Sequence, residues 1–225
     1  MSVSVHGGNL WVVSRTRGIP AERILDFSAA FNPWPVQVPS AFREEAWRQA
    51  RHYPDPSYAQ FRQAAAGWEG VDPEAILPGS GTADLIHLIS RGRKGARCWI
   101  PVPTFTEYAR AVEADGGRVS SWRLPEREDF SGAAFPQSLR NTKVDLVFLC
   151  NPNNPTGKIW PRETVQDLLE LCERQGALLV LDEAYMDLAA PGRRYSLAGD
   201  ASRNRLLLVL RSMTKSFGIP GLRLG

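Results

Sequence analysis

Candidate strands alternate with longer amphipathic stretches along most of the chain, from about residue 74 onward. The strands are mostly short apolar runs without polar alternation, which is typical of strands buried on both faces. They span residues 75–79, 97–102, 118–124, 144–150, 177–183 and 205–211. Amphipathic stretches with helical spacing separate them, at residues 82–92, 105–117 and 161–176. This alternation predicts an α/β fold with a mostly parallel sheet.

The chain before residue 74 has a different pattern. Residues 1–35 form an N-terminal arm with a DFSAAFNP turn, and helices are expected near residues 39–51 and 57–69. In open parallel sheets, ligands bind at the carboxyl ends of the strands. We therefore look for functional residues directly after each predicted strand.

Composition narrows the classes of function. The 225 residues are 43% hydrophobic and 23% charged, which is ordinary for a soluble globular protein. Positive and negative residues are interspersed at a net charge of +3, so we expect no nucleic-acid partner. No stretch reaches the ~18 apolar residues of a membrane helix and the first ten residues lack a signal-peptide pattern, which predicts a cytoplasmic protein without a membrane partner.

The three cysteines, Cys98, Cys150 and Cys172, lack the paired spacing of a zinc site and do not suggest a disulfide framework. We interpret them as buried thiols in a reducing compartment, and we expect no metal site.

A glycine-containing turn, GSGTAD at residues 79–84, follows the first predicted strand and opens a helix. Backbone N–H groups and the helix dipole favour an anion at such a turn. The turn lacks the G-K-[ST] ending of a nucleotide-triphosphate loop. The second strand is followed by Phe105 and Tyr108, each of which could also belong to the core.

Directed polar groups follow the next two strands. The NPNNPTG loop at residues 151–157 presents Asn154, whose amide can donate a hydrogen bond. The DEAY segment places Asp182 at the end of a buried strand and Tyr185 shortly after it. A carboxylate in that position is costly unless a cation pairs with it.

Lysine is rare in this sequence, and one lysine stands out by its position. Lys215 follows the last predicted strand between the hydroxyls of Ser212 and Thr214, with Arg223 eight residues on. The other three lysines, Lys94, Lys143 and Lys158, lie in loops and read as solvated charges. A desolvated lysine can lose its proton and act as a nucleophile, whereas arginine stays protonated.

Together, the strand ends offer an anion cradle, an aromatic side chain, an amide, a buried carboxylate, a phenol and an amine. The cradle would comprise Gly81, Thr82, Ala83, Ser212, Thr214 and Arg223. This set of groups fits a phosphorylated, flat, positively charged ring that carries an aldehyde, and pyridoxal phosphate is such a molecule.

The motifs GSGTAD, PTFTEY, NPNNPTG, DEAY and SMTKSFGIPGLRLG resemble those of fold-type I pyridoxal-phosphate enzymes of the class I/II aminotransferase group, in the same order and spacing. The resemblance covers about residues 75–225 and implies a three-layer α/β/α large domain, here residues 36–225. Family members run about a hundred or more residues further, so we expect this chain to lack the end of that domain and a small C-terminal domain.

The resemblance also implies roles for single residues. Lys215 would bind the cofactor covalently, and Asp182 would hold the ring nitrogen protonated. Phe105 would stack on the ring, while Asn154 and Tyr185 would bond its phenolic oxygen. The residues of the cradle would bind the phosphate. Tyr53 matches a tyrosine that reaches the phosphate of the neighbouring subunit, which implies a homodimer.

The N-terminal motifs HGGN and DFSAAFNP look more like those of L-threonine-O-3-phosphate decarboxylases of cobalamin biosynthesis than like those of histidinol-phosphate aminotransferases. In the decarboxylases this arm covers the phosphate end of the substrate, so His6, Gly7 and Asn32 become candidate contacts of a small phosphorylated amino acid. One position departs from their pattern, because Ala30 stands where an asparagine is usual.

Three hypotheses follow for function. The first is decarboxylation of L-threonine O-3-phosphate to (R)-1-amino-2-propanol phosphate. The second is an aminotransferase of the histidinol-phosphate type, because the same strand-end residues serve both reactions. The third is a catalytically silent fragment or a dimerising scaffold.

Overall fold

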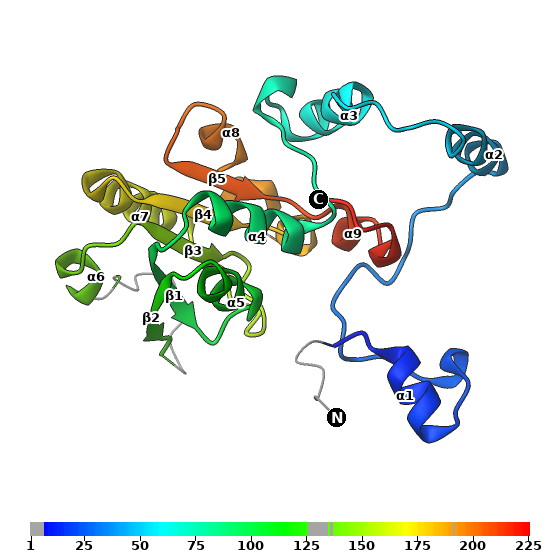
Figure 1. Ribbon diagram of the computed structural model, residues 1–225, viewed down its shortest axis with the longest axis horizontal. Coiled ribbons are helices and arrows are strands. Elements are labelled where there is room, and N and C mark those ends of the chain that lie inside the picture. The colour runs from blue at the N-terminus through cyan, green and yellow to red at the C-terminus, as the bar shows by residue number, and fades with distance from the viewer. Residues whose placement is uncertain (1–6, 126–134, 136, 191) are drawn as a thin grey trace.

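The computed structural model describes residues 7–125, 135, 137–190 and 192–225. Its centre is one sheet of five parallel strands in the order β2-β1-β3-β4-β5 (Figure 1). The strands are β1 (Arg97–Val102), β2 (Arg118–Arg123), β3 (Leu146–Cys150), β4 (Leu178–Asp182) and β5 (Leu207–Leu210). The predicted parallel sheet is confirmed.

Two apolar cores lie on opposite faces of the sheet. On one face, strand residues such as Val180 pack against α4 (Thr82–Gly92) and α5 (Glu107–Ala114). On the other face, Leu179 and its neighbours pack against α7 (Arg162–Gln175). Successive side chains of a strand point to opposite faces, so every residue of β3 and β4 is buried. The three-layer arrangement explains why these strands read as continuous apolar runs.

The helices between the strands begin and end close to the predicted positions. Helix α4 has the predicted bounds. Helix α7 starts directly after Pro161 and ends at Gly176, whose φ of 67° lies in the left-handed region that glycine adopts without strain. Helix α5 is shorter than its predicted stretch of residues 105–117.

The strand expected at residues 75–79 is wrong. A 3-10 turn, η2 (Pro73–Ala75), occupies its start because the Asp72 carboxylate accepts a hydrogen bond from the Glu74 N–H at 2.8 Å. Residues 76–81 then run without regular structure. At the end of this segment Gly79 and Gly225 exchange backbone hydrogen bonds of 2.8 and 3.3 Å.

Helix α3 (Ala59–Glu69) reaches the end of β5, where Glu69 bonds Arg211 at 2.9 Å. The elements before it, α1 (Leu10–Arg17), η1 (Ala21–Arg23) and α2 (Ser40–Gln49), lie apart from the sheet (Figure 1), and α1 and α2 bury none of their residues. Between them, Asn32 and Val36 donate backbone hydrogen bonds of 3.0 Å to the carbonyls of Lys215 and Phe217. The boundary at residue 35 between arm and large domain stays a prediction.

Short elements complete the described chain: α6 (Gln137–Asn141), η3 (Met186–Leu188), η4 (Gly192–Tyr195), α8 (Ala198–Ala201), α9 (Met213–Ser216) and η5 (Pro220–Leu222). None of the helices in the described part of the chain is long and apolar enough to cross a membrane.

Candidate active site

The carboxyl ends of β3 and β4 open into a cavity beside α9 that gathers six of the fifteen site residues predicted from the sequence. Six lining residues were predicted: Thr82, Phe105, Asn154, Asp182, Tyr185 and Lys215. Three others, Tyr108, Cys150 and Ala184, had been given no role. Residues from five separate segments of the chain thus meet at one end of the sheet, as parallel strands require.

Asp182 ends β4 and is 3% exposed. One carboxylate oxygen accepts a hydrogen bond from the Tyr108 hydroxyl at 2.6 Å, and the other accepts the Ala184 N–H at 3.0 Å. Burial raises the pKa of Asp182, while these two hydrogen bonds and the charge of Lys215 act in the opposite direction. Each oxygen keeps a lone pair, so the carboxylate can accept one more donor from the cavity.

Tyr108 is the main residue that the sequence analysis left without a role. It is completely buried, with its ring stacked on Phe148 at 4.9 Å between centroids and Phe105 against its edge at 5.6 Å. Burial and the negative charge of Asp182 raise the pKa of Tyr108 well above 10, so the hydroxyl remains a donor. Its position three residues after Phe105, at the start of α5, was the signal available in the sequence.

The asparagines of the 151–157 loop divide into two kinds. Asn151 bonds the backbone of Trp160 twice, and Asn153 bonds the Pro103 carbonyl and the Thr156 hydroxyl. These bonds hold the loop in shape. Asn154 instead lines the cavity, and its side chain makes no hydrogen bond to any residue within the described ranges.

Lys215 lies on α9 in the cavity wall, with its amine 5.8 Å from the centre of the Tyr185 ring. Burial and the positive charge of Arg223 lower the pKa of Lys215, and the negative charge of Asp182 partly offsets them. The amine therefore reaches its neutral, nucleophilic form at lower pH than a solvated lysine does. Burial raises the pKa of Tyr185 to about 12, which keeps its hydroxyl protonated.

A concentration of donors lies at the start of α4. Gly81 precedes the helix at φ 80°, and a Cβ there would come within 2.7 Å of an Arg223 guanidinium nitrogen. Only glycine lets Arg223 approach the helix N-terminus this closely. At the start of α9 the hydroxyls of Ser212 and Thr214 lie 3.0 Å apart. The structure thus brings a guanidinium to the start of α4 and two hydroxyls together at the start of α9, and their binding of a phosphate stays a prediction.

Other predicted residues lie elsewhere. The Asn32 amide donates to the Ser216 carbonyl at 3.0 Å, which holds it next to α9. Gly7 packs on the Ser28 backbone, so closely that a Cβ would overlap it. Tyr53 is 99% exposed and touches no part of the cavity, and His6 lies outside the described residues.

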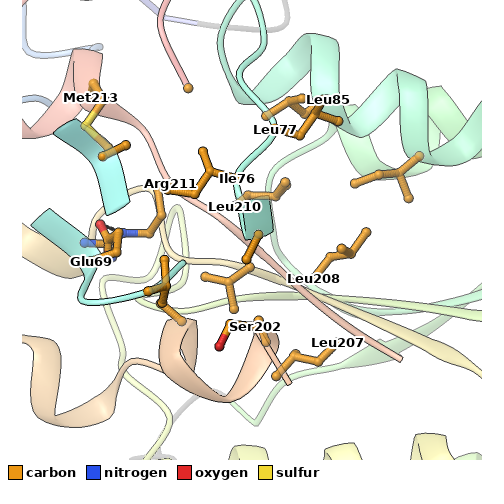
Figure 2. A pocket seen from close by; sticks show the side chains of 18 of the residues that line it. Glu69, Ile76, Leu77, Leu85, Ser202, Leu207, Leu208, Leu210, Arg211 and Met213 are labelled. Carbon is orange, nitrogen blue, oxygen red and sulfur yellow. Dashed lines mark hydrogen bonds and ion pairs between the residues drawn. The ribbon is translucent and has the colours of Figure 1, made fainter. Parts of the chain in front are cut away.

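A second, larger hollow lies between α3, α4 and β5 (Figure 2). Its walls are mostly leucine, isoleucine, valine and alanine side chains, including Leu77, Leu85 and Leu208. None of the residues predicted for the site lines it. The apolar walls offer little reactive chemistry, so we assign the active site to the smaller, polar cavity.

Replacing Arg223 with Gln should raise the pKa of Lys215, because it removes a positive charge that disfavours the protonated amine. Asp182→Asn should instead lower the pKa of Lys215 below its wild-type value, because it removes a negative charge that favours the protonated amine. The pH profile of amine modification at Lys215, resolved by peptide mass from the other three lysines, measures both shifts. An unchanged midpoint in Arg223→Gln would contradict this account of the site.

Comparison with known proteins agrees with the geometry. The model of the family "Aminotransferase class I and II" matches residues 25–225. A threonine-phosphate decarboxylase from Salmonella typhimurium is 36% identical over 99% of this chain and 61% of its own length. A histidinol-phosphate aminotransferase from Caldanaerobacter subterraneus is 34% identical over 77% of this chain and 48% of its own length.

Among solved structures, L-threonine-O-3-phosphate decarboxylase from Porphyromonas gingivalis matches with a TM-score of 0.68 and 31% identity, over 81% of this chain and 55% of that one. The chain thus spans about half to three fifths of the length of these relatives. The family match extends over all five described strands and all of the cavity residues. The chain belongs to the aminotransferase class I and II family.

Proposed function

We propose that this chain is the cofactor-binding part of a pyridoxal-phosphate enzyme that decarboxylates L-threonine O-3-phosphate to (R)-1-amino-2-propanol phosphate. The observation that carries the proposal is that Lys215 and Asp182 line one cavity, while Arg223 lies beside Gly81, next to the cavity residue Thr82. The threonine-phosphate decarboxylase from Salmonella typhimurium, at 36% identity, supports the choice of reaction. A role in cobalamin biosynthesis rests on the resemblance of the N-terminal motifs HGGN and DFSAAFNP.

The donor set of the cavity fits pyridoxal phosphate. The start of α4, Arg223 and the hydroxyls of Ser212 and Thr214 would hold its phosphate. Asp182 would accept a hydrogen bond from the ring nitrogen, Phe105 would cover the ring, and Asn154 with Tyr185 would bond the phenolic oxygen. Gly81 and Ala83 would complete the cradle, Gly81 by admitting Arg223 and Ala83 through its backbone N–H in the first turn of the helix.

In the proposed reaction Lys215 would transfer protons, while Asp182 would bind the ring nitrogen of the cofactor. The bound cofactor supplies an electron-accepting ring for the pair of electrons released at the substrate Cα. Lys215, with its lowered pKa, would provide the neutral amine and afterwards move a proton at the substrate Cα. Asp182 would keep its negative charge opposite the ring nitrogen, and the Tyr108 hydrogen bond favours that charged form.

An aminotransferase of the histidinol-phosphate type is the second candidate, favoured by the relative from Caldanaerobacter subterraneus at 34% identity. Both reactions would use the same cavity and a small phosphorylated amino-acid substrate. Asn32, held against α9, and Gly7 and His6 on the arm are our candidates for contacts to that substrate.

Threonine phosphate and pyridoxal phosphate, supplied with and without 2-oxoglutarate, distinguish these reactions. We expect carbon dioxide release that needs no keto acid, because decarboxylation requires no amino-group acceptor. Turnover that depends on 2-oxoglutarate would instead establish the aminotransferase. Cofactor binding at Lys215 without turnover would identify a silent fragment, and Lys215→Ala is the control for the binding signal.

Tyr108→Phe should weaken pyridoxal phosphate binding by about tenfold, because a hydrogen bond to a charged group contributes roughly 1.5–3 kcal/mol. The change keeps the ring on Phe148 and removes only the donor to Asp182. Cofactor titration followed by absorbance measures the affinity. Tyr58→Phe, at a half-exposed tyrosine outside the cavity, is the matched control, and equal affinities of the two variants would refute the role of Tyr108.

We further propose that the protein is a cytoplasmic homodimer. Large apolar side chains concentrate on the exposed N-terminal segment, among them Trp11, Phe27, Trp34, Trp47 and Tyr53, which are 69–99% exposed. Apolar surface of this extent commonly marks a protein interface. Tyr53 would then reach the phosphate cradle of the second subunit.

Mixing Lys215→Ala chains with Tyr53→Phe chains tests this arrangement. If Tyr53 serves the neighbouring subunit, each mixed dimer contains one site with both residues intact, and we expect cofactor binding of wild-type affinity to return. Failure to recover such sites, or a monomeric mass by light scattering, would contradict the proposal.

A further inference from the structure

Arg211 is a nearly buried cation that the proposed chemistry does not use. It follows β5 directly, and its side chain is 9% exposed. Its guanidinium bonds Glu69 of α3 at 2.9 Å, Asp187 of η3 at 2.6 Å and Glu183 at 3.3 Å. In Figure 2 the Arg211 and Glu69 side chains meet beside the apolar hollow.

Two residues of this cluster of ion pairs and hydrogen bonds, Glu183 and Ser216, are adjacent in sequence to predicted site residues. Glu183 directly follows Asp182 and points to the opposite side of the chain, where it also accepts hydrogen bonds from the Ser196 hydroxyl at 2.6 Å and the Leu197 N–H at 2.9 Å. The second oxygen of Asp187 accepts the Ser216 hydroxyl at 2.8 Å, and Ser216 directly follows Lys215.

Arg211 is therefore connected to residues adjacent in sequence to three site residues. Its bond to Glu183 reaches the neighbour of Asp182, and its bond to Asp187 leads through Ser216 to the neighbour of Lys215. Arg211 is itself the neighbour of Ser212. A planar fork with fixed donor directions sets distances between its partners, which a lysine at the same place would not do.

The charges of the cluster favour its present geometry. Three carboxylates surround Arg211, and Arg193 adds a second cation within 3.8 Å of Glu69 and 3.7 Å of Asp187. Burial raises the pKa of Glu183 to about 7, while the positive charge of Arg211 and the hydrogen bonds from Ser196 and Leu197 act in the opposite direction. Burying the Arg211 charge without these carboxylates would cost free energy of folding. The ion pairs to Glu69 and Asp187 therefore hold α3 and η3 at the end of β5.

We propose that Arg211, acting through Glu183 and through Asp187 with Ser216, is the positioning residue that fixes Lys215 relative to Asp182. The proposal rests on the proposed function and deepens it, because it says how the amine and the carboxylate are held in place in one cavity. The side of α9 nearer the arm is held by Asn32.

Arg211→Lys and Ser216→Ala test the proposal without changing the charge of the protein. Both loosen the link to α9, and we expect the Lys215 amine to meet more water. In cofactor-free protein the midpoint of the pH profile for Lys215 modification should therefore move to higher pH. The groups facing this amine, Arg223, Asp182 and Tyr185, stay unchanged.

Pyridoxal phosphate gives a second readout. Borohydride fixation of the cofactor on Lys215 should become about tenfold slower in both variants, as expected for a misplaced reacting group. Arg97→Lys is the matched control, because Arg97 forms an equivalent fork with Asp145 at 2.9 and 2.7 Å, at the opposite end of the strands. This control should keep the wild-type midpoint and fixation rate.

A wild-type midpoint and rate in Ser216→Ala, or in a folded Arg211→Lys, would overturn the proposal even if the melting temperature falls, because the cluster would then act on stability alone. Should Arg211→Lys fail to fold, Ser216→Ala decides the question by itself. A wild-type protein that takes up no cofactor at Lys215 would refute the proposed function, whereas the pH profile would still test the positioning role.

Discussion

Strands that are buried on both faces have no place for polar side chains except at their ends. In β3 and β4 every residue is buried, and the first acidic group after the apolar run of β4 is Asp182. All five strands are parallel, so their polar ends meet at one edge of the sheet. The cavity, its charges and the elements that support them depend on this constraint.

Two ionic systems share this edge and differ in their surroundings. Asp182 and Lys215 face the cavity, where burial moves their pKa values in opposite directions. Glu183 and Asp187 turn away from it toward Arg211. Successive side chains of an extended backbone point in opposite directions, so Asp182 faces the cavity while the next residue, Glu183, faces Arg211.

The loop between β3 and α7 likewise contains both supporting residues and a residue that faces the cavity. Its asparagines at 151 and 153 satisfy backbone groups that a buried loop would otherwise leave unpaired, so Asn154 remains available to the cavity. Tyr108 plays a comparable part for Asp182, since it combines a stacked ring with a hydrogen bond to a buried charge.

The sequence by itself determined the α/β alternation, the bounds of α4 and the identity of the reactive candidates, because burial on both faces and helix punctuation are local patterns. The tertiary structure decided what depends on distant partners. It paired Tyr108 with Asp182, 74 residues apart, and gathered carboxylates from three elements around Arg211. It also left residues 76–79 outside the sheet, since an apolar run becomes a strand only where another strand offers it hydrogen bonds.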